Sequence, residues 1–180
     1  MILIEGPDGG GKTTLAKMIQ GFTGFSYIHS PGPVKTEDAV KGIIFWHTQL
    51  CQIDNLILDR CFHISEYIYG PIFRQGVNMD VDRLMAYIRV FNQNPKNMFI
   101  LAMGDYPAIK KTSTGKIHLS QEEKIEVENK AEVHKEEIRK RYFNAFFSNE
   151  KFFLDFQNAH VVESIENYAD LFRAIREVTL

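Results

Sequence analysis

A glycine-rich segment near the start of the chain has the residue types that bind phosphate. Gly6-Pro-Asp-Gly-Gly-Gly-Lys12-Thr13 fits the pattern G-x-x-x-x-G-K-S/T, follows an apolar run and opens a stretch with helical periodicity. Glycines let successive backbone N–H groups turn toward one anion, and the N-terminus of the following helix adds partial positive charge. The segment therefore predicts a cradle for the phosphates of a nucleotide.

Individual residues of this cradle have distinct expected roles. The backbone of the central glycines is expected to line it (Gly9, Gly10 and Gly11). Lys12 is placed to reach the β- and γ-phosphates, and the hydroxyl of Thr13 is placed to bind Mg²⁺. Thr14 either gives a further hydroxyl to a phosphate or only fills the first helical turn. The alternative for the whole segment is a glycine-rich turn that caps a helix and binds no ligand.

A second group of polar residues follows a later apolar run. Asn55-Leu-Ile-Leu-Asp59-Arg60 reads as a strand that ends in an acid and a base. Ligands of parallel sheets bind at the carboxyl ends of the strands, so Asp59 is expected to face the cradle and to hold Mg²⁺ or one of its waters. The alternative is a surface salt bridge between Asp59 and Arg60. Tyr69 and Arg74 read equally as substrate contacts or as a core aromatic and a surface charge.

The elements that must position these residues alternate between strands and helices. Short apolar runs bounded by breakers predict five strands, at Met1–Ile4, Phe25–His29, Asn55–Leu58, Met98–Met103 and Ala159–Val162. Helical stretches are expected at Lys12–Phe22, Glu37–Cys51, from Ser65 onward, and at Val81–Phe91, Gln121–Phe147 and Asn167–Val178. Such alternation favours an α/β fold with a parallel sheet covered on both faces. With 180 residues, we expect one domain over 1–180.

Composition excludes several classes of protein. The 21 Lys and Arg against 23 Asp and Glu leave a net charge of −2, so we expect no nucleic-acid partner. The two cysteines form no CxxC pair, and the longest apolar run, Met98–Met103, is far below the roughly 20 residues that span a bilayer. No basic segment precedes the apolar N-terminus as in a signal peptide. We therefore expect a cytoplasmic protein without a disulfide scaffold or a membrane span.

The histidines and cysteines give no metal-ligand spacing. The six histidines are scattered along the sequence, so we expect no transition-metal site. His63 reads as a packed or solvated residue more readily than as part of a substrate pocket. Cys61 follows Arg60, whose charge is expected to lower the pKa of the thiol.

The two polar motifs together resemble the thymidylate kinase-like branch of the P-loop nucleoside and nucleoside monophosphate kinases, including phage-encoded members. The segment from Glu5 to Thr14 is similar to that family's E-G-x-D-G-x-G-K-T-T, and Asp59-Arg60 with Ser65 and Tyr69 is similar to its D-R…S…Y-x-G. The resemblance is specific over these stretches and only architectural elsewhere. It implies a three-layer P-loop fold with a central five-stranded parallel sheet, and transfer of the γ-phosphoryl group of ATP to a small nucleotide.

The resemblance also assigns roles to residues of the acceptor site. It places Asp8 at the acceptor sugar, Arg60 at the acceptor or its phosphate, and Tyr69 against the sugar or base. Phe45 resembles the family phenylalanine that stacks on the base, although a buried core phenylalanine is an equal alternative. The expected catalytic residues are Lys12 at the triphosphate, Asp59 at the magnesium ion, and Arg60.

The sequence departs from the family pattern in several places, among them a shorter Gln49–Asp59 segment and a longer spacing from Asp59 to Tyr69. Gln49 stands where the family usually has an arginine that grips the acceptor phosphate. The family's lid normally bears arginines, whereas the polar segment Gly104–Ser120, which we expect to be a mobile lid, offers only lysines (Lys110, Lys111 and Lys116). Either these lysines neutralise the transferred phosphate, or Arg139 and Arg141 reach in from the following helix.

These observations lead to one expected function and several alternatives. The leading expectation is a kinase that uses ATP and Mg²⁺ to phosphorylate a (deoxy)nucleoside monophosphate, dTMP or a related or modified deoxynucleotide. A deoxynucleoside kinase is the nearest alternative, because of Gln49. A kinase acting on polynucleotides or on modified bases in DNA, and a nucleotide-dependent switch, are further alternatives. A homodimer is also open, because the many aromatic residues suit an interface as well as a core.

Overall fold

The computed structural model describes residues 1–31, 36–73, 79–104, 133–147 and 156–179. Two groups of predicted site residues lie outside these ranges: Arg74, and the lid beyond Gly104 with its lysines (Lys110, Lys111 and Lys116). Whether these residues reach the site therefore stays a prediction. No described helix is long and apolar enough to cross a membrane.

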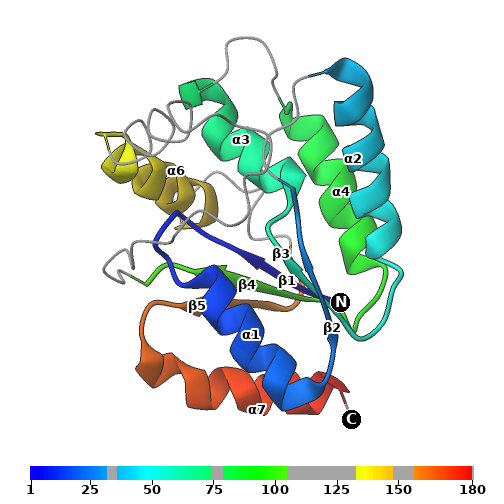
Figure 1. Cartoon of the computed structure of the whole chain (residues 1–180), viewed down its shortest axis with the longest axis vertical. Coiled ribbons are helices and arrows are strands. Elements are labelled where there is room, and N and C mark those ends of the chain that lie inside the picture. Colours follow the sequence, from blue (N-terminus) through cyan, green and yellow to red (C-terminus); the bar gives the residue numbers. More distant parts are fainter. Residues whose placement is uncertain (32–35, 74–78, 105–132, 148–155, 180) are drawn as a thin grey trace.

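The described strands form one parallel sheet (Figure 1). They are β1 (Ile2–Glu5), β2 (Ser26–His29), β3 (Leu56–Asp59), β4 (Met98–Ala102) and β5 (Ala159–Val162). Their spatial order is β2-β3-β1-β4-β5, and every neighbouring pair runs parallel. The expected α/β fold with a five-stranded parallel sheet is confirmed, and each strand begins and ends within one residue of its predicted bounds.

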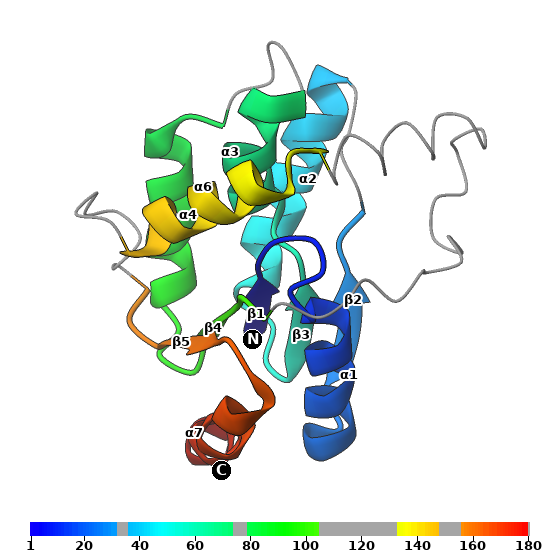
Figure 2. The same ribbon diagram turned by 90° about the vertical axis from the view of Figure 1, so that its left-hand side faces the viewer.

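Helices cover both faces of this sheet (Figures 1 and 2). On one face lie α2 (Glu37–Leu50), α3 (Phe62–Phe73), α4 (Val81–Asn92) and α6 (Lys135–Phe147). On the other lie α1 (Lys12–Thr23) and α7 (Tyr168–Thr179), the latter preceded by the short 3₁₀ helix η1 (Ile165–Asn167). The long predicted helix from Gln121 is confirmed over 135–147, and its earlier part lies outside the described residues.

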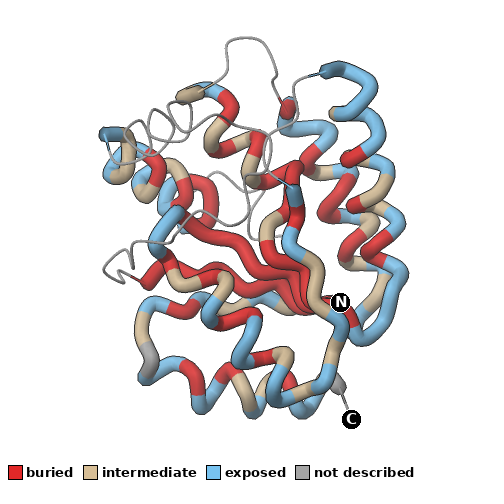
Figure 3. The backbone as a smooth tube through the Cα atoms, in the orientation of Figure 1, coloured by how far each residue is buried: buried red, intermediate tan, exposed pale blue. Residues whose placement is uncertain are grey.

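Alternate residues of each strand enter opposite cores, as the pleat of a strand requires. Leu3 and Leu58 pack with the apolar residues of α2, α3, α4 and α6, whereas Ile4 and Ile57 pack with those of α1 and α7. The three central strands, β1, β3 and β4, are buried along their whole length, whereas the edge strands β2 and β5 are partly exposed (Figure 3). The same alternation decides where the polar strand ends point: Glu5 is on the face of Leu3, and Asp59 is on the face of Ile57.

Helix α3 begins at Phe62, three residues before the predicted start at Ser65. The N–H groups in the first turn of a helix have no partner within the helix and need one from elsewhere. Here the Glu5 carboxylate accepts the N–H of Cys61 at 2.5 Å, and His47 Nδ1 accepts the N–H of Phe62 at 3.0 Å. Both acceptors are distant in sequence, so local sequence signals do not mark this helix start.

Candidate functional site

The glycine-rich loop between β1 and α1 is packed against the carboxyl end of β4. A Cβ atom on Gly6 or Gly10 would collide with the backbone carbonyl of Ala102, so no larger residue fits at either position. Gly11 precedes α1 in the left-handed conformation, with φ of 83°, which favours glycine. The loop therefore keeps a fixed path that leads directly into the N-terminus of a helix, as a phosphate cradle requires.

The side chain of Lys12 lies buried inside this loop. Its Nζ donates hydrogen bonds of 2.7 Å to the carbonyl oxygens of Gly6 and Pro7 and lies 4.0 Å from Asp8 Oδ1. Burial, assisted by the charge of Arg60, lowers the pKa of Lys12 to about 8. Near neutral pH the ammonium is still mostly charged, so the loop holds a cation at the position where the motif predicts one.

Glu5 ends β1 and binds donors from several segments at once. Its Oε1 accepts from the N–H of Cys61 at 2.5 Å and the hydroxyl of Ser65 at 2.9 Å. Its Oε2 accepts from the N–H of Gly6 at 3.1 Å and the hydroxyl of Tyr142 at 2.9 Å. Burial raises the pKa of this carboxyl. Glu5 thereby connects the loop to the start of α3 and to α6.

Asp59 ends β3 on the opposite face and is only half paired. Its Oδ2 lies 2.8 Å from the Thr13 hydroxyl, 2.9 Å from the Tyr27 hydroxyl and 3.0 Å from His29 Nδ1. Its Oδ1 is buried and has no hydrogen-bond partner among the described residues. Burial would raise the pKa of Asp59, but the hydrogen bonds from His29 and Thr13 outweigh it and lower the pKa to about 2. A charged carboxylate oxygen without a partner is the type of ligand that Mg²⁺ takes.

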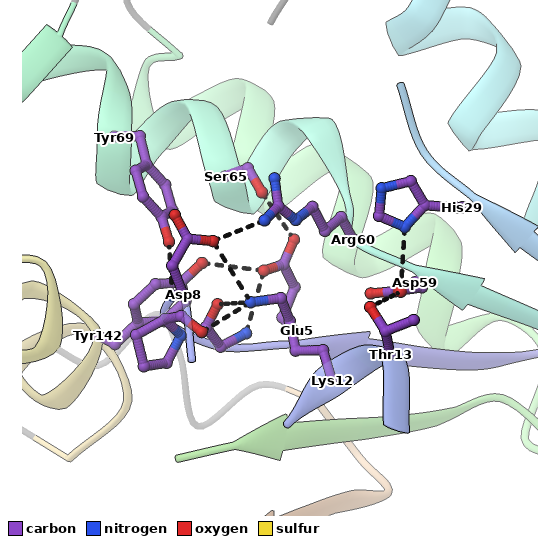
Figure 4. A network of polar contacts seen from close by, with 12 residues as sticks. Glu5, Asp8, Lys12, Thr13, His29, Asp59, Arg60, Ser65, Tyr69 and Tyr142 are labelled. Atoms are coloured by element: carbon purple, nitrogen blue, oxygen red, sulfur yellow. Dashed lines mark hydrogen bonds and ion pairs between the residues drawn. The ribbon is translucent and has the colours of Figure 1, made fainter. Parts of the chain in front are cut away.

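Arg60 turns away from its neighbour Asp59 and pairs with the loop instead (Figure 4). Its Nη2 lies 2.6 Å from Asp8 Oδ1, and the Tyr69 hydroxyl accepts the N–H of Asp8 at 3.2 Å. The alternative of a surface salt bridge between Asp59 and Arg60 is therefore wrong. The structure brings Asp8, Arg60 and Tyr69 together beside Lys12. Tyr69 also packs against the core, so both of its interpretations stay open.

The other residues predicted for the site differ in exposure and in their partners. Phe45 is 67 % exposed on α2, so the alternative of a buried core phenylalanine is wrong, and Gln49 is exposed one turn further along. Thr14 is exposed in the first turn of α1, which leaves both of its expected roles open. Arg139 donates to the carbonyl of Met103, at the end of β4, whereas Arg141 pairs with Glu137 on its own helix.

Sequence reasoning missed Tyr27 and His29. Both lie on β2, two residues apart and thus on one face, and the strand register places His29 directly beside Asp59. The available signal was that two adjacent strands both end in polar residues. The two residues meet Asp59 only through the pairing of β2 with β3, which no local motif marks.

The structure groups two histidines and a cysteine that are apart in the sequence, while the expectation of no transition-metal site stays a prediction. The ligand atoms of His47, Cys61 and His63 all lie within 4.8 Å of one another in the core, although the three residues have no metal-ligand spacing in sequence. His63 is buried, as its packed interpretation predicted. Burial raises the pKa of Cys61, and the nearby Glu5 adds to this, so the expected lowering by Arg60 is wrong.

Comparisons with known proteins support the fold. No protein-family model matches the sequence, and no curated protein is significantly similar to it. Among solved structures, the chain is similar to the YorR protein of Bacillus subtilis, which was crystallised in complex with phosphorylated GDP. The alignment covers 98% of this chain and 95% of YorR, with 16% sequence identity and a TM-score of 0.57. At this identity the similarity concerns the α/β fold.

Proposed function

We propose that the protein is a kinase that transfers the γ-phosphoryl group of ATP to a small nucleotide acceptor. The observation that carries the proposal is the joint placement of two groups at one edge of the sheet: the lysine held inside a glycine cradle and the free carboxylate oxygen of Asp59. The nucleotide bound to the similarly folded YorR supports this use of the fold. We treat residues 1–180 as one catalytic domain that acts in the cytoplasm.

The cradle would bind the donor phosphates by an exchange of partners. Lys12 now donates to two loop carbonyls, and these bonds are replaceable by bonds to phosphate oxygens, which carry more negative charge. The N–H groups of Gly9, Gly10 and Gly11 and the start of α1 complete the anion site. Thr13 and Asp59 would hold Mg²⁺, which when bound neutralises charge on the β- and γ-phosphates. The unpartnered Oδ1 of Asp59 fits this ion.

The acceptor would lie on the Asp8 and Arg60 side of the cradle. Phosphoryl transfer mainly requires in-line positioning and neutralisation of charge. Asp8 would bind the sugar, Tyr69 would pack against it, and the exposed ring of Phe45 would stack on the base. Arg60, about a third exposed, would place its cation near the transferred group. As in the family that the motifs resemble, dTMP or a related or modified deoxynucleoside monophosphate is the acceptor proposed first.

A deoxynucleoside is the second candidate acceptor. Gln49 is exposed and uncharged where an arginine would grip the acceptor phosphate. A neutral amide lacks the paired, charged hydrogen bonds that arginine gives to a phosphate. An acceptor without a phosphate would not need that residue.

The proposal is tested by incubating the purified chain with Mg·ATP and a panel of acceptors. The panel contains nucleosides, nucleoside monophosphates and a DNA oligonucleotide, and ADP release is the readout. Release with monophosphates alone supports the first candidate, and release with nucleosides supports the second. Release with no acceptor, or with the oligonucleotide alone, contradicts the proposal.

Replacing the cradle lysine gives a sharper test of the donor site. We expect Lys12→Ala to lower kcat by at least about 100-fold, because a preorganised cation at the transferred group is lost. Lys17→Ala, an exposed lysine on the same helix, is the matched control and should leave the rate unchanged. Circular dichroism checks that both variants fold. Full activity in folded Lys12→Ala would refute the donor site.

A further inference from the structure

A second cluster of reactive side chains lies in the core, on the α2, α3 and α4 side of the sheet. His47 is on α2, Cys61 immediately precedes α3, and His63 is in the first turn of α3. All three are buried, at 0%, 0% and 2% exposure. Their ligand atoms lie within 4.8 Å of one another, and the proposed kinase chemistry uses none of them. Imidazole and thiolate are the ligands that zinc prefers.

The distances are close to those of a zinc site. Cys61 Sγ lies 3.7 Å from His63 Nδ1. A sulfur and a nitrogen on one tetrahedral zinc ion, with bonds of about 2.3 Å and 2.0 Å, are about 3.5 Å apart. This pair therefore already has nearly the right separation, and His47, whose ligand atom lies within 4.8 Å of both, would have to move closer.

The hydrogen bonds of His47 favour Nδ1 as its ligand atom. The N–H of Phe62 donates to Nδ1 at 3.0 Å, so the neutral ring carries its proton on Nε2, which lies 3.1 Å from Ser30 Oγ. Metal-bound histidines usually donate their other N–H to a fixed partner, and Ser30 is placed to be that partner. A cation at Nδ1 would replace the single bond from Phe62.

An independent observation points to a ligand at the same place. The hydroxyl of Tyr87 is buried beside the thiols of Cys51 and Cys61, and it makes no well-aligned hydrogen bond with a described residue. The Tyr87 ring stacks on His63, with centroids 4.2 Å apart, and its pKa is raised first by burial and then by the adjacent Cys61 and Cys51. A buried unpaired hydroxyl costs free energy and calls for an explanation such as an ion or a water.

We propose that His47, Cys61 and His63 bind one zinc ion, whose fourth position is filled by a water that the Tyr87 hydroxyl holds. The zinc ion would fix the start of α3 to α2. On binding, the Cys61 thiol releases its proton to solvent and its sulfur forms the bond to zinc. Because all three ligands are buried, zinc uptake should accompany folding, and because the ligand is a thiolate, zinc should bind more tightly at higher pH.

Cobalt is the probe, because its spectrum reports a thiolate ligand. The full chain is refolded from denaturant with one equivalent of Co²⁺, without nucleotide or Mg²⁺. We expect one ion per chain, a sulfur-to-cobalt charge-transfer band and the visible bands of tetrahedral cobalt. Zinc should then displace the cobalt and raise Tm. Refolded wild-type protein that is native by circular dichroism but binds no cobalt would overturn the proposal.

The variants separate this site from other thiols and histidines. Cys61→Ser should lose the charge-transfer band, whereas Cys51→Ser, the matched control at the other buried cysteine, should keep it. His63→Gln should weaken cobalt binding by about 10- to 100-fold. A band that survives in Cys61→Ser, or that is lost in Cys51→Ser, places the ion elsewhere and overturns the proposal. If Cys61→Ser does not fold, unchanged affinity in His63→Gln overturns it.

Discussion

Two buried carboxylates lie at the carboxyl edge of the sheet, one on each face, and their surroundings differ. Glu5, at the end of β1, accepts two hydrogen bonds on each oxygen from the loop, α3 and α6. Asp59, at the end of β3, accepts three on Oδ2, while Oδ1 has no partner among the described residues. Both oxygens of the first carboxylate are paired within the described part of the chain, and one oxygen of the second is not.

One edge of a sheet can thus carry a carboxylate that connects segments of the fold and another that keeps an oxygen available to a ligand. A buried charge with all its hydrogen bonds satisfied holds segments together, and its removal leaves several donors unpaired. A buried carboxylate with one unpaired oxygen stabilises the fold less, but that oxygen remains available to bind a ligand. Substitutions at Glu5 should therefore act mainly on folding, and substitutions at Asp59 mainly on turnover.

The largest expected effect is the loss of turnover in Asp59→Asn. The amide removes the negative charge that we assign to Mg²⁺, so kcat should fall by roughly 100- to 1000-fold while the protein stays folded. Phosphoryl-transfer assays at several Mg²⁺ concentrations measure this. Asp54→Asn, at the exposed turn before β3, is the matched control and should be as active as the wild type. Equal activity in both variants would remove Asp59 from the magnesium site.

Glu5→Gln should instead lower the free energy of unfolding. One oxygen becomes an NH₂ group that faces two donors, either those of Cys61 and Ser65 or those of Gly6 and Tyr142. We expect a loss of about 2 kcal/mol in urea unfolding. Glu163→Gln, at an exposed position, is the control. A variant as stable as the wild type but inactive would place Glu5 in the chemistry and undo the contrast with Asp59.

The two carboxylates should also respond to acid with opposite signs. The folded-state pKa of Asp59, about 2, lies below its ordinary value of 3.8, so its contribution to stability is full above about pH 4 and is lost as the pH falls toward 2. Glu5 has a raised pKa, so its charge costs stability at neutral pH, and that cost disappears as the pH falls through the raised pKa.

Unfolding measured against pH in the wild type, Asp59→Asn and Glu5→Gln tests these signs. As the pH falls from 4 toward 2, the stability advantage of the wild type over Asp59→Asn should shrink by about 1–2 kcal/mol. Its stability relative to Glu5→Gln should rise earlier, as the pH falls through the raised pKa of Glu5 toward 4.5, and should change little below about pH 4. The buried His47, whose pKa burial lowers to about 4, titrates in all three proteins and cancels in the differences. Parallel curves for all three would contradict the assigned pKa directions.

Most of the fold could be predicted from the sequence, because the strands are short, apolar and bounded by breakers. The cradle and Asp59 were predictable too, since a motif and a strand end mark them locally. The start of α3 could not be, because its N–H groups bond to Glu5 and His47, which are distant in sequence. The grouping of His47 with Cys61 could not be predicted either, because only the packing of α2 against α3 brings the two residues together.

The smallest expected effects come from removing one hydroxyl from each carboxylate. Tyr27→Phe leaves Asp59 with two donors to Oδ2, and Tyr142→Phe leaves Glu5 with three donors in total. Each loses one charge-assisted hydrogen bond, so each should lose about 1 kcal/mol or somewhat more in urea unfolding.

The enzyme assay should distinguish Tyr27→Phe from Tyr142→Phe. Tyr27 helps to hold Oδ2 so that Oδ1 stays open, so Tyr27→Phe should lower kcat a few-fold and raise the Mg²⁺ concentration needed for half-maximal rate. Tyr142→Phe should change neither when assayed well below its Tm, because Glu5 acts through the fold. If instead Tyr142→Phe shifts the Mg²⁺ dependence and Tyr27→Phe does not, the open coordination position belongs to the Glu5 side of the sheet, and the roles of the two carboxylates are reversed.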